Sequence, residues 1–183
     1  MDHDAPVDDG LIAGAKTRDE LLVRLDQLGL AHRTVDHKAV FTVEESAGVK
    51  DDMPGGHSKN LFLKDKRGDF FLAVALAQTR VDLVGLGKAL GAKGRLSFGK
   101  PDVMSATMGV IPGAVTPFAL MNESAQILRD VILDTALIRE NPVWFHPLEN
   151  TASTAVAPGD LVKFVEACGF APKIIDLSRP LDQ

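Results

Sequence analysis

Hydrophobic and polar positions alternate in the chain between helical and extended patterns, with turn residues between them. Leucines at helical spacing follow the capping box Thr17–Glu20 and end at Gly29, which predicts a helix over residues 18–28. A second capping box, at Thr42–Glu45, predicts a short helix that ends near Gly48. The same kind of pattern predicts three more helices, over residues 82–90, 101–108 and 158–168.

Extended segments lie between these helices. Residues 60–64 and 70–77, joined by the turn at 65–68, are typical of a β-hairpin, and residues 51–57 before them are typical of a polar loop. The second arm is continuously apolar, so we expect it at the centre of a sheet. Further strands are predicted over residues 30–36, 95–98, 129–134, 143–146, 153–157 and 173–177. The order lacks a strict βαβ rhythm and predicts an α+β fold with a mixed, largely antiparallel sheet flanked by helices.

The length of 183 residues fits one domain with a single large core. Residues 1–10 hold four aspartates and no apolar run, so we expect a frayed tail before a domain over residues 11–183. This start is unlike a secretory signal peptide, and no window has the length of a membrane span. Cys168 is the only cysteine, which excludes an intrachain disulfide and favours the cytoplasm.

The net charge of −5 argues against a nucleic-acid partner, but the charges are unevenly distributed. Residues 59–100 hold nine basic side chains and three acidic ones, a local net charge of +6. Such a segment can bind a phosphate backbone, or it can be a lysine-rich solvated face. The sequence leaves both interpretations open.

The usual motifs of metal and covalent catalysis are missing from the sequence. The five histidines show no HxxxH or HxH spacing, and one cysteine cannot build a thiolate cluster. The sequence contains no P-loop, GxGxxG or GxSxG motif. Cys168 lies on the apolar face of a predicted helix, where a free cysteine usually serves as packing material. We therefore expect neither a metal nor a cofactor.

The segment 109–118 combines two glycines and two prolines among apolar neighbours. Proline fixes φ and glycine permits positive φ, so this composition predicts a stiff loop whose amides are not all used by a helix or a sheet. Rigid amides that face a cavity can bind an oxyanion or a carbonyl oxygen. A buried crossover between two elements would have the same composition.

Two further segments carry candidate side chains. Lys59 follows a Gly-Gly-His-Ser run at the start of a predicted strand, where most lysines are exposed and structural. His146 closes another predicted strand and begins the run His146–Thr151. It is either a hydrogen-bonded structural histidine or part of a binding site.

Together these segments resemble the YbaK/ProX family, the editing domains related to the insertion domain of bacterial prolyl-tRNA synthetase. Gly113–Pro117 resembles the family's GxxxP loop, and His57–Leu61 resembles the strand with its essential lysine, which matches Lys59. His146–Thr151 is similar to a segment of the subgroup that removes alanine from proline tRNA, ProXp-ala or PrdX. The resemblance runs from about Thr17 to Cys168 and implies a barrel-like sheet.

The resemblance implies a deacylase for mischarged tRNA, most closely alanyl-tRNA for proline, that uses water and the ribose hydroxyl of the tRNA without a metal. The amides of Ala114, Val115 and Thr116 would bind the ester carbonyl, Gly113 would permit close approach, and Lys59 would hold the terminal phosphate or the ester region. We expect the substrate-binding residues to include Asn60, Phe62, Met108, Ile111, Pro117 and His146. The expected tRNA-binding residues are Lys88, Lys93, Arg95 and Lys100.

Three alternatives remain open at this point: a non-catalytic tRNA-binding module, a deacylase for serine or cysteine on tRNA, and a small-molecule hydrolase that uses the same cavity. The expected partners are the mischarged tRNA and, transiently, prolyl-tRNA synthetase or an elongation factor. We expect a monomer.

Overall fold

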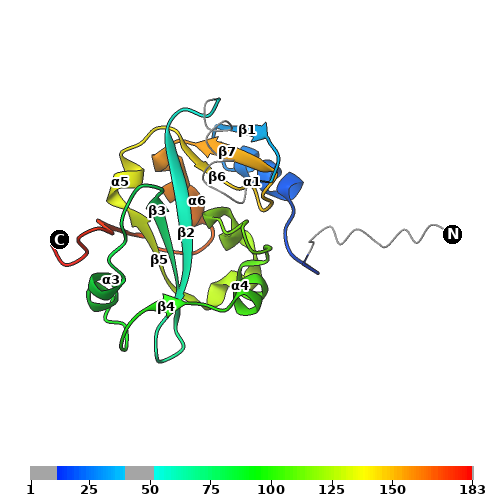
Figure 1. Ribbon diagram of the computed structural model, residues 1–183. Helices are drawn as coiled ribbons and strands as arrows, with labels where there is room; N and C mark the ends of the chain where they lie inside the picture. The colour runs from blue at the N-terminus through cyan, green and yellow to red at the C-terminus, as the bar shows by residue number, and fades with distance from the viewer. Residues whose placement is uncertain (1–11, 40–51, 183) are drawn as a thin grey trace.

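The computed structural model describes residues 12–39 and 52–182. The predicted tail over residues 1–10 and the short helix predicted from Thr42 to Gly48 lie outside the described residues. The described chain forms a single α+β domain built on one sheet, with β2 and β3 running through its middle (Figure 1). This confirms the predicted fold class.

The sheet has eight strands in the order β1-β7-β6-β2-β3-β5-β8, and β4 pairs with β2. Four of the pairings are antiparallel, and three are parallel: β2 with β6, β3 with β5, and β5 with β8. The strands are β1 (His32–Asp36), β2 (Gly56–Lys64), β3 (Phe70–Leu76), β4 (Ser97–Phe98), β5 (Leu128–Asp134), β6 (Val143–Phe145), β7 (Ala152–Val156) and β8 (Lys173–Ile175).

The described helices are α1 (Arg18–Gln27), α3 (Leu83–Ala89), α4 (Pro101–Met108), α5 (Thr135–Ile138), α6 (Pro158–Ala167) and the 3₁₀ segments η1 (Pro117–Met121) and η2 (Glu123–Ile127). At α1 the predicted capping box is confirmed, with 3.3 Å from the Glu20 N–H to Thr17 Oγ1 and 2.8 Å from the Thr17 N–H to Glu20 Oε2. The short elements α5, η1 and η2 were not predicted, because one turn leaves no periodic pattern in the sequence. No helix in the described ranges has the length and apolar composition needed to cross a membrane.

Strand β3 is buried on both faces, as its continuous apolar run predicted. Its side chains alternate between two hydrophobic cores. Leu72 and Val74 pack in one core with Met104 and Met108 of α4, while Phe71, Ala73 and Ala75 pack in the other with Leu86 of α3. These cores, called the α4-side core and the α3-side core below, cover opposite faces of the sheet (Figure 1).

The start of β2 differs from the prediction. Residues 51–57 were expected to form a loop, but the strand begins at Gly56, where Gly56 and His57 pair in parallel with β6. The Gly56 N–H donates to the Pro142 carbonyl at 2.9 Å, and a Cβ on Gly56 would lie 2.5 Å from Glu140 Cβ. Gly56 is therefore needed because a distant segment of the chain packs closely against it, and not because of a local turn.

Candidate functional site

Strand β2 has a partner along most of one edge and at only the two ends of the other. Residues Ser58–Lys64 pair with β3 on the first edge. On the second edge Gly56 and His57 pair with β6, and Leu63 and Lys64 pair with β4. Lys59, Asn60 and Leu61 thus lie where β2 has no strand on that edge within the described chain.

Lys59 and Asn60 lie on opposite faces of the sheet, because side chains alternate along a strand. Lys59 shares its face with Leu61 and Leu63, which contact the α3-side core. Asn60 shares its face with Phe62, which belongs to the α4-side core together with Met108, Val110 and Ala114. Ile111 packs against that same core. Of the predicted residues, the structure therefore brings Asn60, Phe62, Met108, Ile111 and Ala114 to one face and places Lys59 on the other.

Both residues carry polar groups without partners. Lys59 is half-buried, and its ammonium makes no hydrogen bond or ion pair with any described residue. The Oδ1 atom of Asn60 is buried and accepts no hydrogen bond from the described chain, although Nδ2 donates to Ser58 Oγ at 3.4 Å. Buried polar atoms are nearly always hydrogen-bonded, and Asn60 Oδ1 is one of only two such side-chain exceptions among the described residues.

The glycine–proline loop, residues 109–118, is held at both ends. Gly109 ends α4 with φ +68°, and Asn122 Nδ2 donates to the Met108 carbonyl at 2.9 Å. At the other end the buried Thr116 accepts from the Phe118 N–H at 3.3 Å, and Pro117 opens η1. The loop is thus fixed at its first boundary by Asn122 and at its second by Thr116 and Pro117.

The backbone amides inside this loop are only partly available. The Ala114 N–H donates to the Ile111 carbonyl at 3.1 Å in a turn that places Gly113 at φ +91°. The expectation of a free amide is therefore wrong for Ala114, because the turn itself uses that donor. The N–H groups of Val115 and Thr116 make no hydrogen bond to the described residues.

The segment 146–151 lies beside this loop, because Leu148 and Glu149 line the same cleft as residues 109–111. A Cβ added to Gly113 would lie 3.8 Å from Asn150 Nδ2, which is van der Waals distance. His146 Nδ1 lies 3.1 Å from the Ala152 carbonyl, and its ring centroid lies 6.3 Å from that of His37. Burial lowers the pKa of His146, although the bond to the Ala152 carbonyl acts in the opposite direction. His146 is therefore a neutral imidazole at pH 7.

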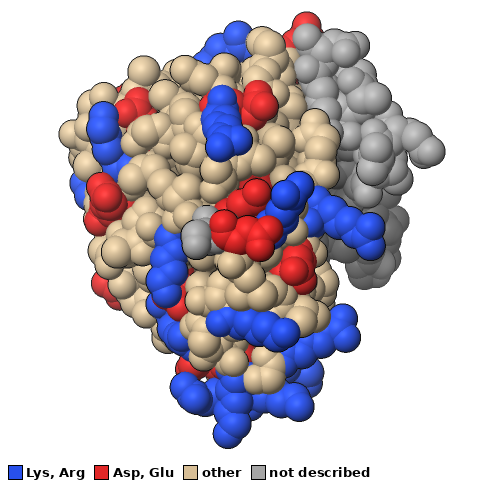
Figure 2. All heavy atoms as spheres, turned by 90° about the vertical axis from the view of Figure 1, so that its left-hand side faces the viewer, with Lys and Arg blue, Asp and Glu red and all other residues tan. Residues whose placement is uncertain are grey.

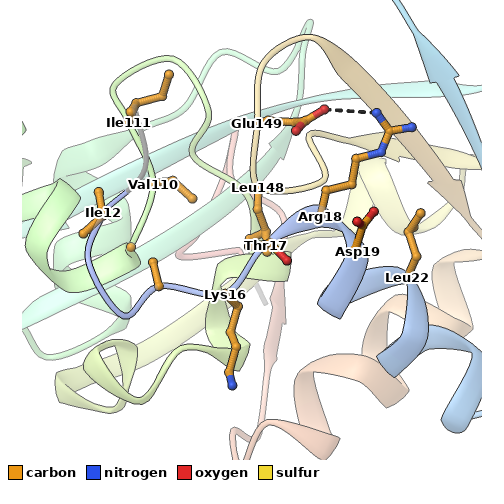
Figure 3. Close-up of a pocket in the computed structure, with 12 residues that line it drawn as sticks. Ile12, Lys16, Thr17, Arg18, Asp19, Leu22, Val110, Ile111, Leu148 and Glu149 are labelled. Atoms are coloured by element: carbon orange, nitrogen blue, oxygen red, sulfur yellow. Dashed lines mark hydrogen bonds and ion pairs between the residues drawn. The ribbon is translucent and has the colours of Figure 1, made fainter. Parts of the chain in front are cut away.

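A cleft of about 390 Å³ lies between the start of α1, the loop residues 109–111 and residues 148–149. Figure 3 shows Arg18 and Glu149 joined at 3.0 Å on one side of this cleft, with Val110 and Ile111 on the other. Arg18 also contacts Asp36 at 2.6 Å, and this hydrogen bond, more than that to Glu149, raises the pKa of the guanidinium. Sequence reasoning missed Arg18 and Glu149, because no local pattern marks an ion pair across 131 positions.

The expected tRNA-binding residues lie at one end of the molecule, which we call the cationic end. It comprises the β2–β3 turn, the last turn of α3, the loop after it and the segment around β4, and its basic residues are Lys64, Lys66, Arg67, Lys88, Lys93, Arg95 and Lys100. Lysine and arginine side chains gather at the lower end in Figure 2, where Figure 1 places this turn and β4. Apart from Arg67, which lies 4.0 Å from Asp69, none of the seven has an ion pair with a described residue.

Cys168 lies at the C-cap of α6 and is half-buried. Burial raises the pKa of its thiol to about 11, so the nucleophilic thiolate is scarce at neutral pH. We expect Cys168→Ala to change the activity of the protein less than about twofold, since a protonated packing thiol contributes no nucleophile. A rate assay before and after treatment with a thiol alkylating reagent checks this. Loss of activity in the Cys168→Ala variant and also in the alkylated wild-type protein would mean that the thiol takes part in catalysis.

Metal ligands are also sparse. Across residues 12–39 and 52–182 no group of three or more histidine, cysteine, aspartate or glutamate side chains is arranged to hold a metal ion. The candidate residues named above offer backbone donors, a lysine, amide side chains and a histidine whose pKa is lowered by burial.

Comparison with known proteins places this domain in the class of aminoacyl-tRNA editing domains. Residues 37–164 match the family described as "Aminoacyl-tRNA editing domain". The chain belongs to this family, also called YbaK/ProX, whose members are aminoacyl-tRNA deacylases, and it is an editing enzyme of that kind.

Individual relatives agree with this family. The chain is 36% identical over 169 residues to prolyl-tRNA synthetase associated domain-containing protein 1 of Mus musculus, covering 90% of this chain and 99% of the relative. It is 32% identical to the prolyl-tRNA editing protein ProX of Acetoanaerobium sticklandii, covering 86% and 95%. A crystal structure of a candidate trans-editing enzyme for prolyl tRNA synthetase has the same fold, with a TM-score of 0.67, 19% identity and coverage of 86% and 94%.

Proposed function

We propose that this enzyme deacylates alanyl-tRNA for proline by attack of water on the aminoacyl ester, with help from the ribose hydroxyl of the tRNA and without a metal. One observation carries the proposal. Lys59 and Asn60, consecutive in β2, present polar groups without partners in the described chain, at the one stretch where the outer edge of β2 is open. A substrate bound at that edge meets both side chains, although they lie on opposite faces.

The reaction needs little from the protein, because an aminoacyl ester is already activated. Water attacks once the ester is held still and its carbonyl is polarised. The N–H groups of Val115 and Thr116 supply donors for the carbonyl oxygen and the developing oxyanion, and a single such donor contributes about 3 kcal/mol. Gly113 permits close approach, and the turn that uses the Ala114 N–H fixes the direction of the next two amides. Lys59 holds the terminal phosphate or the ester region as a point charge.

The amino-acid pocket lies on the face of the α4-side core. Ile111, which lines the cleft, supplies its apolar wall, and the buried Phe62 and Met108 pack behind that wall. Asn60 Oδ1 supplies an acceptor for the α-ammonium group of the substrate. Pro117 fixes the end of the loop, and His146 contributes a neutral ring beyond β6. A small, stiff pocket accepts alanine and excludes the larger proline by steric clash.

Deacylation rates across alanyl-, seryl-, cysteinyl- and prolyl-tRNA, all on proline tRNA, test this proposal. We expect alanyl-tRNA to be hydrolysed fastest and prolyl-tRNA to be spared. Faster hydrolysis of the seryl or cysteinyl ester than of the alanyl ester would show that the enzyme prefers that amino acid instead. Binding without turnover of any substrate would indicate a non-catalytic tRNA module, and equal rates on aminoacyl esters that lack the tRNA body would indicate a small-molecule hydrolase.

We place the tRNA body on the cationic end. We also expect the protein to act as a monomer with transient contacts to prolyl-tRNA synthetase or an elongation factor.

Binding of tRNA to the protein should weaken as the salt concentration rises, although the protein is acidic overall. If about three phosphates are neutralised, the slope of log affinity against log salt should be near −2 to −3.

Charge reversal at Lys88, Lys93 or Lys100 should weaken tRNA binding more than reversal at Lys163 or Lys173. The first three make no ion pair with the described chain, whereas Lys163 contacts Asp160 at 3.0 Å and Lys173 contacts Asp130 at 2.7 Å. Binding isotherms at several salt concentrations measure both effects. Equal losses at all five positions would show that the cationic end is only a solvated face.

A further inference from the structure

The two loops of the cationic end are joined by one buried carboxylate. Asp65 Oδ1 accepts the N–H groups of Arg67 at 2.8 Å, Gly68 at 3.0 Å and Asp69 at 3.1 Å, while Oδ2 accepts the Lys93 N–H at 2.8 Å. Burial acts to raise the pKa of Asp65, but these four donors outweigh it and hold the pKa below its usual value. The β2–β3 turn and the loop after α3 therefore form one fixed unit that carries the basic side chains.

An aromatic ring projects beside this unit. Phe98 in β4 is 60% exposed, and it is the only phenylalanine or tryptophan among the described residues whose side chain is largely exposed. Its backbone is held in place, because Phe98 pairs with Leu63 and the next N–H, that of Gly99, donates to the Phe62 carbonyl at 2.9 Å. A Cβ on Gly99 would lie 2.4 Å from the Phe62 ring, so the segment is in tight contact with β2.

Two basic residues close in sequence flank Phe98, namely Arg95 and Lys100. Lys64 pairs with Ser97, so its side chain lies on the face opposite that of Phe98. Two acidic groups of this region are engaged, because Asp65 is buried in the loop unit and Asp69 contacts Arg129. Asp102 is exposed in the first turn of α4. A rigid exposed ring among unpaired cations combines the two features by which proteins bind single-stranded nucleic acid, base stacking and backbone contact.

We propose that Phe98 is a stacking platform for an unpaired nucleotide of the tRNA, with Arg95 and Lys100 contacting the adjoining phosphates. This inference rests on the proposed tRNA substrate. Leu63, the partner of Phe98, is four residues beyond Lys59 in β2, about 13 Å along the strand. The platform thus lies a short single-stranded span from the proposed ester site, and it positions the unpaired 3′ end of the tRNA along the open edge of β2.

Tryptophan fluorescence provides a direct test, because the natural Trp144 is buried and gives a constant background. We expect the emission of a Phe98→Trp variant to be quenched on titration with a short single-stranded RNA that ends in CCA, and much less with a duplex RNA of equal length. Ile127→Trp is the matched control, since Ile127 is equally exposed at 60% and lies outside the cationic end. Unchanged emission of the Phe98→Trp variant at saturation, or equal quenching by the duplex, would overturn the proposal.

Affinity provides a second, independent readout. Phe98→Ala should weaken binding of uncharged proline tRNA about tenfold at a fixed salt concentration, Phe98→Tyr should retain it, and Ile127→Ala should leave it unchanged. An unaltered affinity of Phe98→Ala would contradict the platform while leaving editing in place if the protein still deacylates alanyl-tRNA. Weakened tRNA binding by Phe98→Ala, together with no turnover of any aminoacyl-tRNA by the wild-type protein, would instead support the platform and contradict the proposed function.

Discussion

Replacing Lys59 with alanine is expected to lower kcat/KM for deacylation of alanyl-tRNA about a hundredfold or more. The proposed role of the ammonium is to hold the terminal phosphate or the ester region, and losing one fixed electrostatic contact to the reacting group has an effect of this size. Because Lys59 makes no ion pair or hydrogen bond within the described chain, its removal should leave the midpoint of thermal unfolding nearly unchanged.

Two further variants sharpen this experiment. Lys59→Arg keeps the charge but changes its shape and reach, so we expect only partial activity. Lys163→Ala removes an exposed lysine on α6, outside the proposed site, and should retain the wild-type rate. Wild-type turnover by a folded Lys59→Ala protein would remove Lys59 from the mechanism and would leave the loop amides as the principal catalytic groups.

The elements that could be predicted from the sequence are those determined locally. The capping box at Thr17 and Glu20 fixes the start of α1 through contacts three residues apart. The hairpin of β2 and β3 likewise follows from a turn and two adjacent apolar runs. In both cases the interactions that decide the structure lie inside the window in which the pattern is recognised.

The sequence was less informative where distant segments meet. Gly56 looks like a loop residue, but it pairs with β6 because it permits close approach to residues 140–142. The proximity of Asn150 to Gly113 and the ion pair between Arg18 and Glu149 involve positions that no local pattern connects. The use of the Ala114 N–H in a turn depends on backbone angles that composition does not determine.

The candidate site includes motifs that could be recognised in the sequence and an arrangement that depends on distant segments. The resemblance selected Lys59, the loop and His146 as separate motifs, and these remain proposals for the chemistry. What only the structure adds is that Lys59 and Asn60 lie on opposite faces at an open stretch of strand edge. Phe98 pairs with Leu63, at the end of that open stretch of β2. The sequence alone gave this phenylalanine no functional role.

The largest stability effect is expected at Asp134, the last residue of β5. Its carboxylate is fully buried and accepts four hydrogen bonds, from the Leu76 N–H at 3.1 Å, Thr79 Oγ1 at 2.6 Å, the Ala136 N–H at 3.2 Å and the Leu177 N–H at 3.4 Å. These donors come from the end of β3, the turn after it, the start of α5 and the segment after β8. One side chain thus joins four parts of the chain where the parallel strands end.

Asp134→Ala should lower the free energy of unfolding by about 3–5 kcal/mol, because it leaves several buried donors without an acceptor and each costs about 1–3 kcal/mol unless water enters. Asp134→Asn keeps one acceptor oxygen and should lose less. Asp160→Ala, which removes a more exposed carboxylate paired with Lys163, is the matched control and should change the free energy by less than about 1 kcal/mol. Urea unfolding measures all three, and an Asp134→Ala midpoint equal to that of the wild type would show that this junction is held by apolar packing alone.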